Sequence, residues 1–236
     1  MASRDRISDQ PAFLLHSVPY METSLVLDLF TRDHGRIGAV AKGAKRPHSA
    51  LRPVLLQFQH LRVGYTGRNE LRTLTAAEWT GRLASPKGYG LLCAFYLNEL
   101  LIKLLARDDP YPELFDGYQQ ALTDIAAGAQ LDDTLRRFEW LLLRETGYCP
   151  DLERDNENQP IKDDIYYSWV PASGFLVAEP GSESIRGQAL QDIATLEWTS
   201  DNSRQQAKYL TRRILNHCLD GAELNTRKIM LDLQRL

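Results

Sequence analysis

The chain has 236 residues, of which 43% are hydrophobic and 25% are charged, and its net charge is −3. These values are ordinary for a folded globular protein and exclude a disordered chain. The longest apolar run, LLCAFYL, is too short to span a bilayer, and the N-terminus lacks the apolar segment of a secretory signal. The three cysteines are too widely spaced for a disulfide framework. We therefore expect a cytoplasmic protein.

The first 80 residues predict an all-β region. Apolar and polar residues alternate there in short runs, and turn signals such as DHG (33–35) and TGRN (66–69) separate the runs. The predicted strands cover residues 12–18, 24–31, 36–43, 55–67 and 70–79. Gly43 is expected to let the backbone turn after the third strand. Five short strands without a helical period favour a small closed or nearly closed barrel.

The hydrophobic period becomes helical from Leu83 onward. The predicted helices cover residues 90–109, 112–127, 132–148 and 200–221. Pro112 suits a first helical position, Asp132 or Asp133 is a candidate N-cap, and Gly147 and Gly221 are candidate helix stops. Residues 160–182 break the pattern and predict a β-hairpin insertion. We therefore expect two domains, a barrel over residues 1–82 and a helical domain over residues 83–236.

No motif in the chain predicts an active site. The sequence has no phosphate-binding loop, no dinucleotide fingerprint and no GxSxG elbow. The histidines at 16, 34, 48 and 60 lack the spacing of a zinc site. The acid pairs at 108–109, 132–133 and 163–164 are better explained as helix caps and solvated turns than as general acids and bases. We therefore expect no enzymatic activity, no metal and no cofactor.

Positive charge is concentrated in the predicted barrel. Residues 1–82 hold 12 Lys and Arg against 7 Asp and Glu, a net charge of +5, whereas the remainder carries −8. The 36 residues from His34 to Asn69 contain no acid at all. Such a surface favours a polyanion, because phosphate neutralisation by Lys and Arg releases counterions. Phe58, Tyr65 and Tyr20 are candidate stacking residues, although Phe58 is equally a core candidate and the arginines could only solubilise the barrel.

Two stretches of the chain resemble the bacterial recombination-mediator family RecO. The first is PYMETSLVLDLFTRDHGRIGAVAKGAKRPHSALRPVLLQFQHL, which is similar to the family's N-terminal hairpin and loop, and the second is LRRFEWLLLRETGYCPDL, which is similar to its helical signature. The similarity covers most of the chain and is clearest over residues 12–152.

The resemblance implies an α+β multidomain protein, with an N-terminal five-stranded OB-fold barrel followed by an α-helical domain. It implies a non-enzymatic DNA repair and recombination mediator of the RecF pathway. Such a mediator binds single- and double-stranded DNA, anneals complementary strands and, with RecR, assists RecA loading on DNA coated by single-stranded-DNA-binding protein. Many relatives carry a Cys-x-x-Cys zinc site, but Cys149 has no cysteine pair downstream. No zinc finger is therefore expected here.

Both lines of reasoning lead to one set of predicted DNA-binding residues. They are Arg36, Lys42, Lys45, Arg46, Arg52, Arg62, Arg68 and Arg72. A second set of cations shares a helical spacing: Arg204, Lys208, Arg212 and Arg213. This set could extend the DNA path. It could equally receive the acidic tail of single-stranded-DNA-binding protein, with Leu210, Ile214 and Leu215 near an apolar groove. A plain solvated helix face also explains this second set. The alternative function is an adaptor that binds proteins and not DNA, and a nuclease or hydrolase ranks third.

Overall fold

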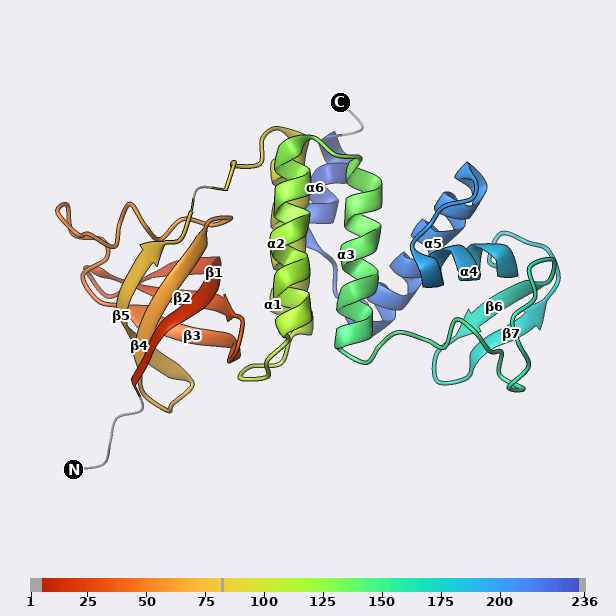
Figure 1. Cartoon of the computed structure of the whole chain (residues 1–236), viewed down its shortest axis with the longest axis horizontal. Helices are drawn as coiled ribbons and strands as arrows, with labels where there is room; N and C mark the ends of the chain where they lie inside the picture. Colours follow the sequence, from red (N-terminus) through yellow and green to blue (C-terminus); the bar gives the residue numbers. More distant parts are fainter. Residues whose placement is uncertain (1–5, 82, 234–236) are drawn as a thin grey trace. The chain divides into compact units, whose positions relative to one another are not determined.

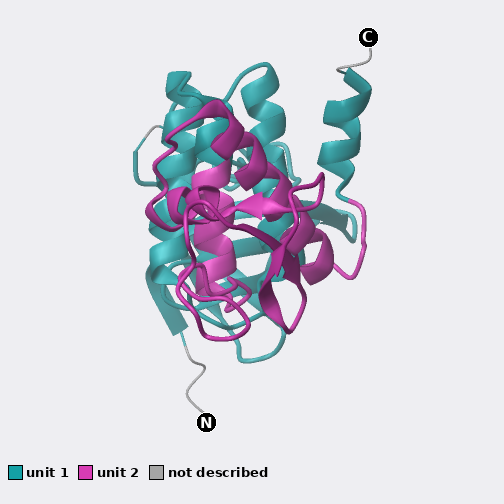
Figure 2. Ribbon diagram, turned by 90° about the vertical axis from the view of Figure 1, so that its right-hand side faces the viewer, with its two compact units in different colours: residues 1–135, 224–236 teal, residues 136–223 magenta. Residues whose placement is uncertain are grey.

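The structure is a computed structural model that describes residues 6–81 and 83–233. The chain forms two compact units, one of residues 1–135 with 224–236 and one of residues 136–223 (Figures 1 and 2). The first unit therefore contains the barrel together with helices, and the division between the units falls within a helix. The change of period near Leu83 marks a change of structural class but not the edge of a compact unit.

Five strands close the predicted barrel in the first unit. They are β1 (Arg6–Tyr20), β2 (Ser24–Thr31), β3 (Gly35–Ala41), β4 (His60–Thr66) and β5 (Leu71–Trp79). Their order is β1-β2-β3-β5-β4, and β1 also pairs with β4, so the sheet has no open end. All pairings are antiparallel except β3 with β5. This five-stranded topology is the OB-fold that the resemblance implied.

Alternation along the strands fills the barrel interior as predicted. Ile37, Ala39 and Ala41 of β3 are fully buried, and they join inward residues of the other strands such as Leu61 and Val63 in one apolar cluster. The fourth strand differs from its prediction, because it begins at His60 and not at residue 55. Residues 55–59 instead close the barrel as turns, which lets Leu55 pack into the same cluster.

Three helices complete the first unit: α1 (Tyr89–Leu104), α2 (Pro112–Ala127) and α6 (Asn225–Leu233). Pro112 occupies the predicted first helical position. The α6 helix was not predicted. It packs on α1, and both carboxylate oxygens of Glu99 accept hydrogen bonds from the first backbone amides of α6, at 2.8 and 2.9 Å.

Aromatic side chains join the barrel to α2 within this unit. Phe13 packs against His60, Phe115 and Tyr118, with ring centroids 5.0–5.2 Å apart for Phe115, Tyr118 and His60. Asn98 of α1 donates a 2.9 Å hydrogen bond to the carbonyl of Leu15. Gly35, whose φ is +66°, lies so close to the segment after α1 that a Cβ would come within 1.9 Å of the carbonyl oxygen of Asp109. Barrel and first helices are thus packed as one body.

His60 makes this junction sensitive to acid. Burial, reinforced by the nearby cation of Arg62, lowers the pKa of His60 below its ordinary value of 6.5. As the pH falls, His60 is therefore protonated in the unfolded chain before it is protonated in the folded chain. The contribution of neutral His60 to the free energy of unfolding is full above about pH 6.5 and is lost on acidification toward the lower folded pKa. We expect urea unfolding midpoints to fall between pH 7.5 and 5.5, and to fall less in His60→Phe. His16→Gln, at an exposed position, should keep the full pH dependence; an unchanged dependence in His60→Phe would contradict the assignment.

The second unit combines a small sheet with helices. The division falls within α3 (Leu131–Glu145), and the unit holds β6 (Tyr166–Val170), β7 (Gly174–Ala178), β8 (Ile185–Arg186), α4 (Gly187–Thr195) and α5 (Asp201–Cys218). The predicted hairpin is β6–β7, and β8 adds a third strand beside β6. Asp132 and Asp133 lie in the first turn of α3 and are not its N-cap, whereas Ser200 caps α5 by accepting a 3.1 Å hydrogen bond from the Ser203 amide.

Two charged residues of the helical signature are buried and structural. Arg136 and Glu139, both in the stretch LRRFE, form an ion pair on α3 with side chains only 4% and 0% exposed. Asp192 of α4, which was not singled out from the sequence, is also buried and accepts hydrogen bonds from Ser203, Thr199 and Gln188. These hydrogen bonds outweigh burial, which opposes ionisation, and lower the pKa of Asp192.

Candidate nucleic-acid interface

The loop between β3 and β4, residues 42–59, carries the most accessible positive charge of the barrel. Gly43 turns the chain directly after β3 with φ +70°, as expected. Successive backbone hydrogen bonds between residues three apart, such as Ser49 N to Arg46 O at 3.1 Å, fold the following residues into tight turns. Lys45 N donates a 2.9 Å bond to Thr23 O, which holds this loop against the β1–β2 turn. The basic loop is thus held in two ways: Ala44 and Leu55 pack into the apolar cluster of the barrel, and the Lys45 amide bonds to the β1–β2 turn.

Four of the eight predicted DNA-binding residues lie together on this loop. Lys42, Lys45, Arg46 and Arg52 are exposed, and within residues 6–81 and 83–233 their side chains have no hydrogen bond or ion pair. An unpaired cation can bind a phosphate without first breaking an ion pair within the protein. We call these four residues the basic loop cluster.

Two other predicted contacts are committed inside the protein. Arg36 is 12% exposed; its Nε donates to Asp28 at 3.0 Å, and its Nη1 donates to the carbonyls of Leu105, at 3.0 Å, and Ile102. These carbonyls end α1, so Arg36 caps that helix. Arg72, 14% exposed, pairs with Asp108 at 2.6 Å and lies over the Tyr65 ring. We therefore leave Arg36 and Arg72 out of the proposed DNA-binding surface.

The remaining two predicted contacts lie outside the basic loop. Arg62 on β4 is partly exposed and pairs with Asp9 at 3.1 Å. Arg68 is exposed in the β4–β5 turn, at the opposite end of β4 from the basic loop. The acid-free stretch of the sequence consequently does not fold into one continuous positive patch.

Of the three candidate stacking residues, one is accessible. Phe58 is 6% exposed and packs edge-on against Phe95 with ring centroids 5.0 Å apart. Tyr65 is 2% exposed in the barrel interior, where burial raises its pKa to about 12. Both are core residues, so the alternative that Phe58 belongs to the core is confirmed and the prediction that Tyr65 stacks on bases is wrong. Tyr20 is 38% exposed, beside the β1–β2 turn that contacts the basic loop.

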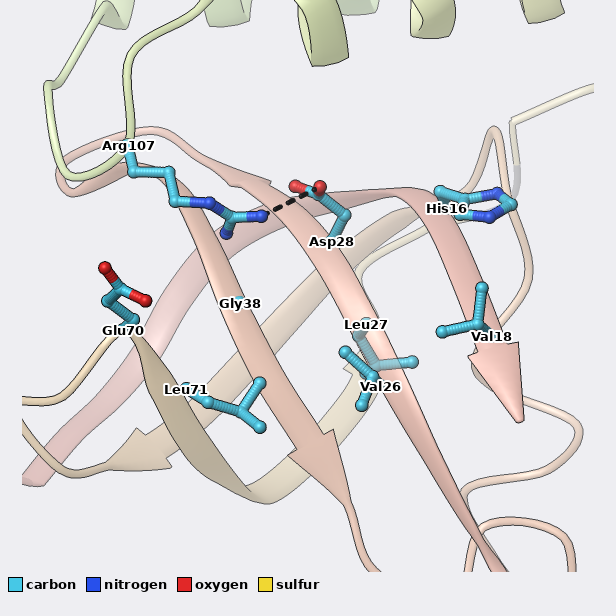
Figure 3. A pocket seen from close by; sticks show the side chains of 9 residues that line it. All are labelled: His16, Val18, Val26, Leu27, Asp28, Gly38, Glu70, Leu71 and Arg107. Atoms are coloured by element: carbon cyan, nitrogen blue, oxygen red, sulfur yellow. Dashed lines mark hydrogen bonds and ion pairs between the residues drawn. The ribbon is translucent and has the colours of Figure 1, made fainter. Parts of the chain in front are cut away.

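A groove of about 260 Å³ crosses the outer face of the barrel (Figure 3). Val18, Val26 and Leu71 supply its apolar surface, and Asp28 and Glu70 contribute carboxylates. Arg107 reaches over it from the segment between α1 and α2 and approaches Asp28 at 3.4 Å. Sequence reasoning missed Arg107, which lies outside the basic stretch and has no local signal.

The second predicted set lies along α5 but is not uniformly available. Arg213 donates to the carbonyls of Trp169 at 3.2 Å and Glu183 at 3.4 Å, which ties α5 to the small sheet. Arg204 pairs with Asp201 at 2.8 Å, and Lys208 and Arg212 are partly buried. Leu210, Ile214 and Leu215 are at most 2% exposed. These three residues belong to the core, so they do not line an open groove for a partner's tail.

The described residues offer no metal site and no membrane helix. Within residues 6–81 and 83–233, no three His, Cys, Asp or Glu side chains are grouped so as to hold a metal ion. The Cys149 thiol donates a 3.4 Å hydrogen bond to the carbonyl of Pro150. No helix in the same residues is long and apolar enough to cross a bilayer.

Comparison with known proteins decides the family. The model described as "Recombination protein O N terminal" matches residues 6–82, and "Recombination protein O C terminal" matches residues 87–228. The chain belongs to the RecO family. The "DNA repair protein RecO" of Ralstonia nicotianae is 48% identical over 98% of this chain and 86% of that protein. Those of Burkholderia pseudomallei and Polynucleobacter asymbioticus are 49% and 44% identical over 99% and 98% of this chain, covering 86% and 98% of the relatives.

Membership of the RecO family confirms the resemblance seen in the sequence. The chain is a DNA repair and recombination protein by family, and the family is named for repair and not for an enzymatic reaction. The N-terminal match covers the OB-fold barrel that carries the basic loop cluster, so the strongest candidate surface lies in the part shared with other RecO proteins.

Proposed function

We propose that this chain binds single- and double-stranded DNA without sequence specificity and anneals complementary strands. The observation that carries the proposal is the basic loop cluster, four exposed cations on one loop of an OB-fold. OB-folds bind oligonucleotides along their β2–β3 face and with their β1–β2 and β4–β5 loops. The basic loop lies between β3 and β4, and its Lys45 amide bonds to Thr23 in the β1–β2 turn, which brings the cluster beside that surface. Phosphate neutralisation is independent of sequence, because every nucleotide carries the same charge.

Annealing follows from charge neutralisation. Two complementary strands repel each other as polyanions, and a surface that holds several cations close together screens that repulsion. Base pairing then supplies all the specificity, so the protein needs no group that reads base edges. No nucleotide hydrolysis enters this mechanism, and we propose a non-enzymatic role without metal or cofactor.

The partners we propose are RecR, with which the chain would assist RecA loading, and single-stranded-DNA-binding protein. Family membership supports these partners. The acidic tail of single-stranded-DNA-binding protein requires a cationic site, and its candidates are the α5 cations Arg204, Lys208, Arg212 and Arg213, of which Arg213 also donates to the carbonyl of Trp169. Such a protein works in the cytoplasm, at the nucleoid. The alternative is an adaptor without DNA binding, which the net charge of −8 outside the barrel favours.

Strand annealing with and without single-stranded-DNA-binding protein, repeated across a salt series, tests the proposal. We expect the protein to accelerate annealing without added nucleotide. The acceleration should fall steeply as salt rises, because releasing counterions from DNA is less favourable at high salt and DNA affinity therefore drops. Binding of RecR that is independent of salt, together with no DNA binding by the full chain, would instead establish the adaptor. Metal-dependent cleavage of labelled DNA would contradict a non-enzymatic role.

A further inference from the structure

Strand β7 forms one edge of the small sheet in the second unit. The strand order is β7-β6-β8, so β7 has a neighbouring strand, β6, on one side only (Figure 1). The two strands pair continuously from Tyr166 with Ala178 to Val170 with Gly174, without a bulge. The sequence of β7, GFLVA, contains no charged residue and no proline, although such residues usually protect a sheet edge from pairing. The other side of β7 is therefore a candidate site for an added strand.

The backbone along this edge is closed at one residue and open at the next. In an antiparallel pair, the N–H and C=O groups of every second residue point to the same side of the strand. The Asn156 amide donates a 2.8 Å hydrogen bond to the carbonyl of Phe175, so Phe175 points away from β6. Val177 points to the same side, and its N–H and C=O have no partner there among the residues that the structure describes.

The apolar face of the sheet also ends uncovered at Val177. Val177 lies opposite Tyr167, and Phe175 lies opposite Trp169, so the four side chains share one face. Phe175 and Tyr167 are at most 1% exposed, whereas Val177 is 63% exposed. A side chain on an added strand, directly across from Val177, would extend this apolar face and cover the valine.

Negative charge surrounds the open edge. Residues 149–184, which include β6 and β7, hold eight Asp and Glu against two cations, Arg154 and Lys162. In residues 6–81 and 83–233 none of these eight carboxylates forms an ion pair. Glu179 directly follows β7, and Glu157 adjoins Asn156, which contacts the strand at Phe175. Both glutamates are exposed, so carboxylates flank the open edge along the direction of an added strand.

We propose that the open edge of β7 binds an extended segment of a partner protein, in which Lys or Arg residues flank an apolar one. The segment adds a strand to the sheet: its backbone bonds to Val177, its apolar side chain covers that valine, and its cations approach Glu157 and Glu179. A second copy of this chain does not fit, because pairing two β7 strands brings Glu179 of one copy toward Glu157 of the other.

This site differs from those proposed above. Its carboxylates repel an acidic tail, so it is separate from the cationic site proposed on α5. It also needs no DNA binding by the barrel, so either proposal can fail without the other.

Fluorescence anisotropy of the full-length chain with labelled ten-residue peptides tests the proposal. The probe alternates Lys and Val; one control peptide has the same sequence with every amide N-methylated, and the other alternates Glu and Val. We expect the probe to bind at least about tenfold more tightly than either control, because only it combines backbone donors with positive charge. The probe should also slow hydrogen exchange of the Val177 amide, which charge attraction alone does not do.

Variants of the chain locate the site. Val177→Lys should weaken binding of the probe by about tenfold, because a lysine on the edge repels the peptide and removes the apolar contact. Val170→Lys is the matched control, since it adds the same charge at another exposed valine of the hairpin, and it should change the affinity less than about twofold. Glu157→Gln combined with Glu179→Gln should weaken binding about fivefold, the effect of losing two exposed ion pairs. Glu22→Gln combined with Glu78→Gln, at exposed positions of the barrel unit, should have no effect.

Three results would overturn the proposal. Equal affinity for the probe and its N-methylated form, or an equal loss in Val177→Lys and Val170→Lys, would reduce the binding to charge attraction. A dimer of the chain that persists in excess peptide during sedimentation would assign the edge to a second copy. Failure of the wild-type chain to bind the probe would show that the edge accepts no basic strand.

Discussion

Replacing Lys42, Lys45 and Arg46 together by alanine is expected to reduce affinity for single-stranded DNA by about 100-fold at 0.1 M salt. Each phosphate contact on a single strand contributes roughly 0.7 to the slope of log affinity against log salt, so three contacts contribute about 2. All three side chains are exposed and have no internal partner in the described part of the chain. Fluorescence anisotropy across a salt series measures both the affinity and the slope.

A charge-matched variant separates the basic loop from net charge alone. Lys87, Arg137 and Lys162 are also exposed, and replacing them by alanine changes the net charge by the same three units. This control should leave the slope close to its wild-type value. Full DNA affinity in the triple loop variant at physiological salt, or an equal loss in the control, would exclude the basic loop cluster as the phosphate site.

Arg36→Ala is expected to lower the free energy of unfolding by about 3 kcal/mol, because it removes the closer cation from the largely buried Asp28, which keeps only Arg107 at 3.4 Å, and it removes the donor that caps α1. Asp28 is only 16% exposed and would lose its 3.0 Å bond, and the carbonyls of Ile102 and Leu105 at the end of α1 would lose their shared donor. Chemical unfolding followed by circular dichroism measures the change.

Lys42→Ala, one residue after the same strand, is the control for Arg36. Its side chain is exposed, so its removal should change stability by less than about 0.5 kcal/mol while it lowers the salt slope. Arg36→Ala should instead lower the stability and leave the salt slope of DNA binding unchanged, measured at temperatures where the variant stays folded. Wild-type stability combined with a reduced salt slope in Arg36→Ala would show that Arg36 contacts DNA and does not cap α1.

The elements with regular local patterns were predictable. The alternation of Ile37, Ala39 and Ala41 indicates which face of β3 lines the barrel interior, and Pro112 indicates where α2 begins. The extent of β4 was not predictable, because Leu55 and Phe58 continue the apolar pattern of a strand although they close the barrel as a loop. The helices α4 and α6 were missed, and each has only nine residues.

Sequence alone determined that the positive charge of this protein is concentrated in its barrel, and that Gly43 begins a basic loop. Only the tertiary structure decided which cations are available. Arg36 and Arg72 pair with groups from the segment around α1, and Arg107 from that same segment joins the groove. The physical reason is that burial and ion pairing depend on neighbours tens of residues away in the chain, whereas periodicity and turn propensity depend on adjacent residues. Charge composition therefore pointed to the candidate interface, and packing decided which of its cations stay exposed.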